Sequence, residues 1–221
     1  MDWIHNYQLF LFDFDGVLVN SEEVHYQAYQ RMCAKRGFSL KWDRQRYMQA
    51  ALYQADGLEK AIYGECPALR EIPWPVLYEE KKLAYKELLL EKPVELMPGV
   101  AQLLEALQKA DIPRAVVTNS RIAETEKIRQ MQPLLNSIPY WICREHYKNP
   151  KPDPEGYLTA IAKLGPAEKI IGFEDSPRGL RALVGTPAKA VLVSSVLAPH
   201  EIAKLAEECD FAHISSFEEA P

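Results

Sequence analysis

Short apolar runs recur along the chain, and each is followed by turn residues and then by apolar positions at helical spacing. Such runs are typical of buried strands, whereas apolar positions three and four residues apart predict amphipathic helices. In residues 100–110, for example, Leu103, Leu104 and Leu107 fall on one helix face. The runs predict strands at residues 9–12, 114–117, 140–143, 170–173 and 190–193. Strands that alternate with helices predict an α/β fold in which helices cover both faces of an open parallel sheet.

Residues 21–93 interrupt this alternation. The segment is rich in Tyr, Gln, Glu and Lys, and its apolar spacing is helical without a clear strand, up to Pro93. We therefore expect a small all-helical domain inserted after the first strand, with linkers near Asn20 and near Lys92. The alternative is a helical stretch that packs into one continuous domain. The expected boundaries are 1–20 and 94–221 for the α/β core and 21–93 for the helical domain.

Polar and charged residues follow the predicted strands at their carboxyl ends. Asp13 and Asp15 follow the first strand, and Lys151 lies in a Lys-Pro-Asp-Pro loop after the third. In an open parallel sheet, ligands bind outside the carboxyl ends of the strands. Each signal alone is a common turn or helix start, but their joint occurrence at strand ends indicates one site. The set consists of Asp13, Asp15, Thr118, Asn119, Ser120, Lys151, Glu174 and Asp175.

These residue types suggest phosphoryl transfer. Several carboxylates at one sheet edge repel one another unless a cation lies among them. Oxygen ligands with room for water and a phosphate suit Mg²⁺, which is therefore the expected cofactor. A carboxylate beside such a metal can attack phosphorus and form an aspartyl-phosphate. A second carboxylate can protonate the leaving oxygen and then activate water, while a lysine and a hydroxyl hold the phosphoryl oxygens.

Composition and charge narrow the class of partner. The 221 residues carry a net charge of −5, which gives no electrostatic reason to expect nucleic acid or an anionic membrane. The four cysteines form no Cys-x-x-Cys pair, so neither a disulfide framework nor a zinc site is expected. The sequence shows no secretory signal pattern and no apolar run approaching about 18 residues. We expect a soluble, cytoplasmic monomer whose partner is a small phosphorylated metabolite.

The first of these motifs resembles that of a known superfamily. Residues 13–21, "DFDGVLVNS", are similar to the D-x-D-G-[TV]-[LI]-x-[DN]-[ST] motif of the haloacid dehalogenase superfamily. Thr118, Lys151 and the pair Glu174-Asp175 fill its second, third and fourth motifs. The resemblance is to the branch with β-phosphoglucomutase and small-sugar phosphatases. It implies a Rossmann-like parallel core, with residues 21–93 as a helical cap.

The resemblance also implies a role for each matching residue. Asp13 would be the nucleophile and Asp15 the general acid and base, with Lys151 as the third catalytic residue. The implied Mg²⁺ ligands are Asp13, the main-chain carbonyl of Asp15, Glu174 and Asp175. The implied phosphate-binding residues are Thr118, Asn119, Ser120, Arg121 and Lys151. Relatives that release halide lack the second aspartate and the metal acids, so their presence argues against dehalogenation.

The helical segment is expected to decide between phosphatase and mutase. A β-phosphoglucomutase grips a second phosphate with a cap arginine, and Gln54 stands at the comparable position here. A neutral amide is a poor substitute for a bidentate clamp, which favours a phosphatase of a sugar phosphate or similar metabolite. A mutase is the alternative, and an inactive binding protein on the same scaffold is a further one. The candidate cap residues for substrate are Ser21, His25, Gln54 and Lys81.

Two of these cap residues also have a structural interpretation. His25 matches a histidine near the hinge of β-phosphoglucomutase, but it could equally be a histidine packed at the linker. For Lys81, a solvated helix charge is the favoured interpretation over a substrate contact.

Overall fold

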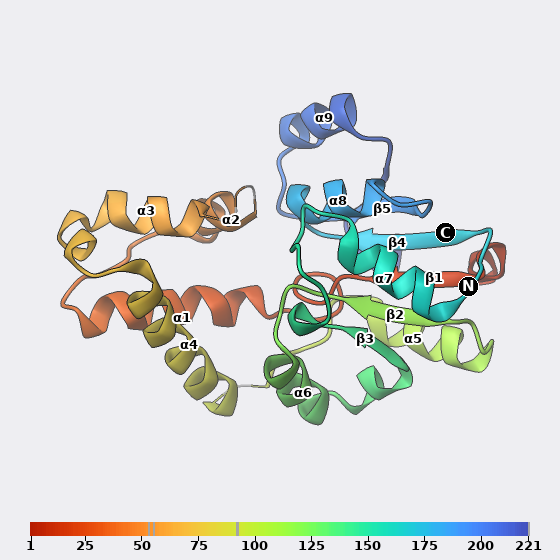
Figure 1. Ribbon diagram of the computed structural model, residues 1–221, viewed down its shortest axis with the longest axis horizontal. Helices are drawn as coiled ribbons and strands as arrows, with labels where there is room; N and C mark the ends of the chain where they lie inside the picture. The colour runs from red at the N-terminus through yellow and green to blue at the C-terminus, as the bar shows by residue number, and fades with distance from the viewer. Residues whose placement is uncertain (53, 55, 92, 221) are drawn as a thin grey trace. The chain divides into compact units, whose positions relative to one another are not determined.

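The structure, a computed structural model, describes residues 1–52, 54, 56–91 and 93–220. The chain divides into two compact units, one formed by residues 1–20 with 95–221 and the other by residues 21–94. The first unit contains the sheet, and the described residues of the second form only helices and their connections (Figure 1). The linker expected near Lys92 falls outside the described residues. That the helical unit acts as a cap stays a prediction.

The sheet has six parallel strands in the order β3-β2-β1-β4-β5-β6. The five strands expected from the apolar runs are confirmed, each to within one residue. The sixth, β6, was missed because its three residues are mostly exposed and show no apolar run. The strands are β1 (Leu9–Phe12), β2 (Arg114–Val117), β3 (Tyr140–Ile142), β4 (Ile170–Glu174), β5 (Lys189–Val193) and β6 (Ala212–Ile214).

Strand β1 lies at the point where the strand order reverses. The chain moves from β1 outward to β2 and β3, and then crosses back to β4 on the other side of β1. All four residues of β1 are buried, and Phe12 pairs with Val116 of β2 and Phe173 of β4. The residues after β1 therefore emerge between two diverging connections, which is where ligands bind in open parallel sheets.

Aromatic side chains fill one face of the sheet around β1. Phe12 and Phe173 stack with ring centroids 5.3 Å apart, and Phe217 meets Phe173 edge-on at 5.0 Å. Trp3 closes the other end of this cluster against Phe10 at 5.7 Å. Aromatic pairs at these distances contribute about 0.5–1.5 kcal/mol each beyond the burial of their area. The 3-10 helices η1 (Asp2–Asn6) and η5 (Phe217–Glu219) are thus tied to the sheet at both chain ends.

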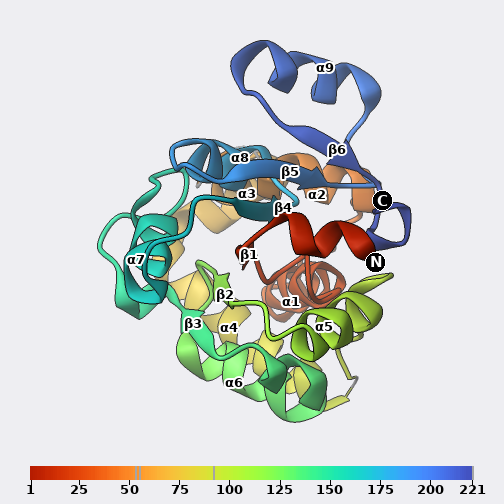
Figure 2. The same cartoon turned by 90° about the vertical axis from the view of Figure 1, so that its right-hand side faces the viewer.

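Helices α7 (Glu155–Leu164) and α8 (Pro177–Val184) cover the opposite face, whereas α5 (Val100–Lys109) and α6 (Ile122–Met131) lie across the sheet from them (Figure 2). Gly172 of β4 allows the close approach of α8, because a Cβ there would lie 2.4 Å from Leu183 Cδ1. The remaining elements of this unit are η3 (Pro133–Ser137), η4 (Arg144–His146) and α9 (Pro199–Glu208).

The helical unit is built around an α1–α4 pair. Arg31 of α1 makes an ion pair with Glu91 of α4, and Arg36, the residue after α1, makes one with Glu80 of α4. Within the described residues, no helix combines the length and apolar character needed to cross a bilayer. The elements of this unit are α1 (Glu22–Lys35), α2 (Arg44–Leu52), α3 (Gly57–Glu65), η2 (Pro67–Glu71) and α4 (Trp74–Glu91).

Replacing Phe217 by alanine tests whether the last helical turn belongs to the core. Phe217 is 1% exposed, so Phe217→Ala leaves a cavity beside Phe12 and Phe173. We expect a loss of about 3–5 kcal/mol in the free energy of unfolding, measured by chemical denaturation. Leu158→Ala is the control, since Leu158 is 43% exposed, and it should change stability by no more than about 0.5 kcal/mol. Equal effects of the two changes would contradict this assignment.

Candidate active site

The predicted core residues all lie at the carboxyl edge of the sheet, around the end of β1. Asp13 directly follows β1, and its backbone N–H donates to Phe173 O of β4 at 2.9 Å. Thr118 directly follows β2, where its backbone N–H donates to Ile142 O of β3 at 2.9 Å. Glu174 is the last residue of β4. The sheet ladder thus sets the spacing of the three strand ends on which the site is built.

Lys151 joins the first and fourth motifs through its ammonium group. Its Nζ donates to Asp13 Oδ1 at 2.6 Å and lies 2.6 Å from Glu174 Oε1. It also donates to Val117 O at 2.8 Å. An ammonium has three protons, so these three acceptors account for all of them. All three charged side chains of this group are buried, which makes each of them dependent on the others.

Negative charge nevertheless dominates the group. Burial, and next the charge of Glu174, raise the pKa of Asp13 from its ordinary 3.8 to about 7, although Lys151 acts to lower it. For Lys151, burial acts to lower the pKa, but the Asp13 and Glu174 carboxylates outweigh it and raise the pKa above its ordinary value. One lysine therefore stabilises these carboxylates only in part, and a further cation would relieve the remaining repulsion.

The carboxylates have the arrangement of a metal site. Asp13, Glu174 and Asp175 each offer an oxygen, and these oxygens lie within 4.8 Å of one another. Glu174 is fully buried, yet its Oε2 accepts no hydrogen bond from any described residue. A buried carboxylate oxygen without a partner costs free energy unless a cation meets it. Hard oxygen ligands in this number fit Mg²⁺.

Two glycines allow the backbone to approach these carboxylates. Gly16 has φ 78°, and a Cβ there would lie 2.0 Å from Asp175 Oδ2. Gly179, in the first turn of α8, would place a Cβ 2.0 Å from Glu174 Oε2. Any larger residue at either position would push a carboxylate away from the group. Ser176 caps the same turn of α8 by accepting a hydrogen bond from Gly179 N at 3.1 Å.

The loop after β2 contributes hydroxyl groups to the same edge. Ser120 Oγ donates to Asp15 Oδ2 at 2.5 Å, which orients the second aspartate. Thr118 is 1% exposed, and its Oγ1 accepts from Ser120 N at 2.9 Å. Arg121 is exposed at the start of α6. The sheet edge therefore brings together Asp15, Thr118 and Ser120.

Asn119 ties two loops together. Its Oδ1 accepts from Tyr147 Oη at 2.7 Å and from Lys151 N at 3.3 Å. Tyr147 Oη also lies 2.7 Å from Thr118 O, so its single proton is shared between these two acceptors. The loop after β2 is thereby joined to the segment that carries Lys151. A role of Asn119 in binding phosphate stays a prediction.

In the helical unit, the favoured interpretation of Lys81 as a solvated charge is wrong. Its side chain is 4% exposed, and its Nζ donates to His25 Nδ1 at 2.6 Å. The His25 ring in turn stacks on Tyr85 with centroids 4.2 Å apart. Lys81 Nζ also lies 5.0 Å from the centroid of Tyr29, as in cation–π contacts. Ser21 is buried immediately before α1, and its carbonyl accepts from His25 N.

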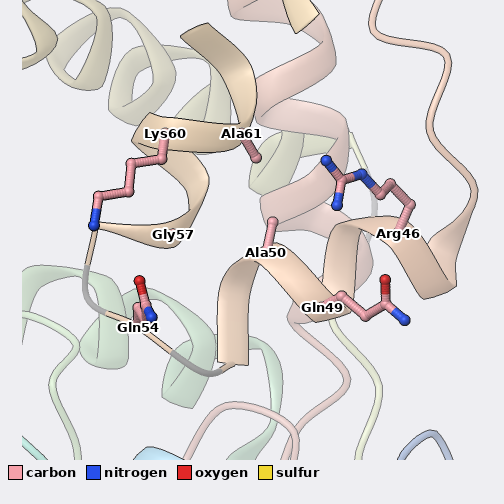
Figure 3. A pocket seen from close by; sticks show the side chains of 7 residues that line it. All are labelled: Arg46, Gln49, Ala50, Gln54, Gly57, Lys60 and Ala61. Atoms are coloured by element: carbon pink, nitrogen blue, oxygen red, sulfur yellow. The ribbon is translucent and has the colours of Figure 1, made fainter. Parts of the chain in front are cut away.

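Gln54 lies apart from this pair, in a pocket between α2 and α3 (Figure 3). The pocket has a volume of about 370 Å³ and lies wholly within the helical unit. Arg46 and Gln49 line it from α2, and Lys60 lines it from α3. Lys60 also pairs with Asp56 at 2.7 Å, and the Arg46 guanidinium lies 5.4 Å from the ring centroid of Trp42. Arg46 therefore supplies a guanidinium in the pocket that contains Gln54.

Sequence reasoning missed three residues of the sheet-edge site: Tyr147, Tyr157 and Gly179. Tyr157 is fully buried on α7, and its hydroxyl donates to Glu174 Oε1 at 2.5 Å. Its only sequence signal is an aromatic residue six positions after Lys151, which is common on any buried helix face. Gly179 could have been noticed as a glycine in the first turn of a helix that follows an acidic pair.

Proteins similar to this chain include a sugar-phosphate phosphatase and a phosphoglucomutase. A phosphorylated carbohydrates phosphatase from Thermotoga maritima is 31% identical over 175 residues, which cover 78% of each chain. A crystal structure of a CbbY variant from Rhodobacter sphaeroides with xylulose-1,5-bisphosphate is 25% identical, covers 96% of both chains and has a TM-score of 0.76. A β-phosphoglucomutase from Clostridium difficile shares the fold at 20% identity, with coverage of 97% and 93% and a TM-score of 0.72.

The family assignment rests on the sequence match as well as on the fold. The profile of the haloacid dehalogenase-like hydrolases matches residues 7–185, a range that includes every strand-end residue described above. Together with the 31% identical phosphatase, this match shows that the chain belongs to the haloacid dehalogenase-like hydrolases.

Proposed function

We propose that this hydrolase is a Mg²⁺-dependent phosphatase that acts on a small phosphomonoester, a sugar phosphate or similar metabolite, through an aspartyl-phosphate. The observation that carries the proposal is the buried group in which Lys151 bridges Asp13 and Glu174, while Glu174 Oε2 accepts no hydrogen bond from any described residue. The relative from Thermotoga maritima, named as a phosphatase of phosphorylated carbohydrates, supports the substrate class.

In the first step, an Asp13 carboxylate oxygen attacks phosphorus and the bond to the ester oxygen breaks. Asp15 donates a proton to that leaving oxygen, and the hydrogen bond from Ser120 orients its carboxyl group for this transfer. In the second step, Asp15 takes a proton from water as the water oxygen attacks phosphorus. The bond from phosphorus to Asp13 then breaks, which releases inorganic phosphate and restores the carboxylate.

The remaining residues hold the transferring group. Lys151 is placed to neutralise charge on the phosphoryl oxygens, and the Thr118 hydroxyl and the Ser120 backbone lie at the same edge. Asp13, the Asp15 carbonyl, Glu174 and Asp175 would hold Mg²⁺. When bound, Mg²⁺ supplies positive charge that offsets the charge of the phosphoryl oxygens and of the clustered carboxylates.

The helical unit, residues 21–94, is proposed to act as a cap that selects the substrate. Arg46, Gln54 and Lys60 give its pocket a polar and cationic lining suited to hydroxyl and anionic groups of a sugar phosphate. The buried His25–Lys81 pair is proposed to support the base of the cap near Ser21. We further propose that the protein works as a cytoplasmic monomer.

A β-phosphoglucomutase-type mutase is the second candidate. A mutase must return its phosphoryl group to a bisphosphate intermediate and exclude water, for which a cationic clamp on the second phosphate is needed. Gln54 lacks that charge and favours the phosphatase, but Arg46 in the same pocket could supply it. This placement of Arg46 is the observation that keeps the mutase as an alternative.

Replacing the nucleophile tests the mechanism. Asp13→Asn should lower phosphate release by on the order of 10³-fold or more, because an amide cannot form the acyl phosphate. Mg²⁺ binding, measured by calorimetry, should remain detectable through Glu174 and Asp175. Asp210→Asn, at an exposed carboxylate, serves as the matched control and should retain full activity. If turnover of small phosphate esters survives the Asp13→Asn change, the mechanism is wrong.

A product analysis separates phosphatase from mutase. The protein is incubated with β-glucose 1-phosphate, Mg²⁺ and a trace of the glucose bisphosphate, and free phosphate and glucose 6-phosphate are both quantified. We expect free phosphate as the main phosphorus-containing product, with a panel of phosphorylated sugars and small acids defining the preferred substrate. Rapid formation of glucose 6-phosphate without free phosphate would establish the mutase instead.

A further inference from the structure

Tyr157 contacts both charged partners of the nucleophile. Its hydroxyl donates to Glu174 Oε1 at 2.5 Å, and the centroid of its ring lies 4.9 Å from Lys151 Nζ. We propose that Tyr157 is a positioning residue that fixes the Glu174 carboxylate so that Oε2 is the oxygen presented to the divalent cation. The inference rests on the proposed function in that it assumes a cation at this carboxylate group.

The argument begins with the asymmetry of the Glu174 carboxylate. The two oxygens of a carboxylate are chemically equal, so only their surroundings decide which one faces a ligand. Oε1 is bound by the Tyr157 hydroxyl and by Lys151 Nζ at 2.6 Å. Oε2 accepts no hydrogen bond from any residue that the structure describes, although the side chain is fully buried. The two donors to Oε1 therefore hold the carboxylate in one orientation, with Oε2 facing the other way.

Lys151 alone is poorly suited to fix this orientation. Its three donors are shared among Asp13 Oδ1, Glu174 Oε1 and Val117 O. During phosphoryl transfer, Lys151 also has to donate to the oxygens of the substrate. These oxygens compete with Glu174 for the protons of the ammonium group. The Tyr157 hydroxyl has Glu174 as its partner and lies on the α7 side, away from that competition. It can therefore keep Glu174 in place while Lys151 moves.

A buried tyrosine usually finds some hydrogen-bond acceptor, so a purely structural role has to be separated from positioning. Tyr63 provides the comparison within this chain, because its hydroxyl donates to the Ile72 carbonyl at 2.7 Å. A backbone carbonyl would satisfy Tyr157 equally well. Tyr157 instead donates to a carboxylate whose other oxygen has no partner among the described residues, and its ring lies against Lys151. Both contacts are with charged residues of the site.

The test is Tyr157→Phe, which keeps the ring and removes the hydroxyl. The affinity of the substrate-free protein for Mn²⁺ is measured from the spin-resonance signal of the free ion, with Mg²⁺ as competitor. Partners that orient metal ligands typically contribute 10–100-fold to metal affinity, so we expect Mn²⁺ and Mg²⁺ binding about 10-fold weaker or more. Tyr63→Phe is the matched control, because it removes a hydroxyl of the same kind, and it should leave both affinities unchanged.

A second comparison identifies the partner through which Tyr157 acts. In a Glu174→Gln background, adding Tyr157→Phe should weaken Mn²⁺ binding by less than about 2-fold, because coupled residues are not additive. An unchanged Mn²⁺ affinity in Tyr157→Phe, or a full additional loss in the double variant, would overturn the proposal. A Tyr157→Phe protein that fails to fold, with Tyr63→Phe folded, would also overturn it by assigning the hydroxyl to folding.

These measurements are independent of the proposed phosphatase activity. If the wild-type protein binds Mn²⁺ but hydrolyses none of the phosphomonoesters, the proposed function fails while the Tyr157 comparison still stands. If phosphate release is normal and Tyr157→Phe binds Mn²⁺ as the wild type does, the positioning role alone is wrong.

Discussion

The sheet edge depends on one buried contact, in which the Lys151 ammonium lies between the carboxylates of Asp13 and Glu174. Removing these charges from water is costly, and none of the three would be stable there without the others. The contact requires β1 and β4 to be neighbours, since Asp13 follows the former and Glu174 ends the latter. It also requires the loop before α7 to bring Lys151 back across the ends of β2 and β1. The aromatic cluster beneath β1 and β4 supplies the rigid support that these positions need.

The same contact leaves the site short of positive charge. With Asp175 close to Asp13 and Glu174, the carboxylates outnumber the lysine. Burial, and next the charge of Glu174, raise the pKa of Asp13 above its ordinary value in spite of Lys151. Gly16 and Gly179 leave room for the Asp175 and Glu174 carboxylates to lie close together. Their oxygens are then near enough to bind one metal ion, and the repulsion between the carboxylates is larger. Structure and electrostatics thus favour a divalent cation at the same place. Tyr157 belongs to this arrangement, because it donates to Glu174 Oε1, while Oε2 accepts no hydrogen bond from any described residue.

The proposed function assigns chemistry and selectivity to different units of this hydrolase. The strand ends that carry Asp13, Lys151 and Glu174 belong to the sheet unit, whereas the pocket with Arg46, Gln54 and Lys60 belongs to the helical unit. The match of the family profile to residues 7–185 spans both. If the proposed roles hold, a change in the helical unit alters which phosphorylated molecule is accepted and leaves the proposed nucleophile, Asp13, unchanged. The choice between phosphatase and mutase depends on whether Arg46 in that pocket supplies the positive charge that a mutase needs for the second phosphate.

The sequence by itself determined the strands at 9–12, 114–117 and 170–173, because buried parallel strands are continuous apolar runs. It also placed Asp13, Thr118 and Glu174 at strand ends and Lys151 in the loop after the third strand, since that follows from the order of strands and turns alone. The short, exposed β6 lacked such a run and was missed. Only the tertiary structure decided that Lys81 is buried against His25 and that Tyr157 meets Glu174. The first contact joins α1 to α4, and the second joins α7 to the end of β4. His25, Lys81 and Tyr157 stand at helical spacings that are typical of ordinary core, so their partners depend on how the helices pack against the rest of each unit.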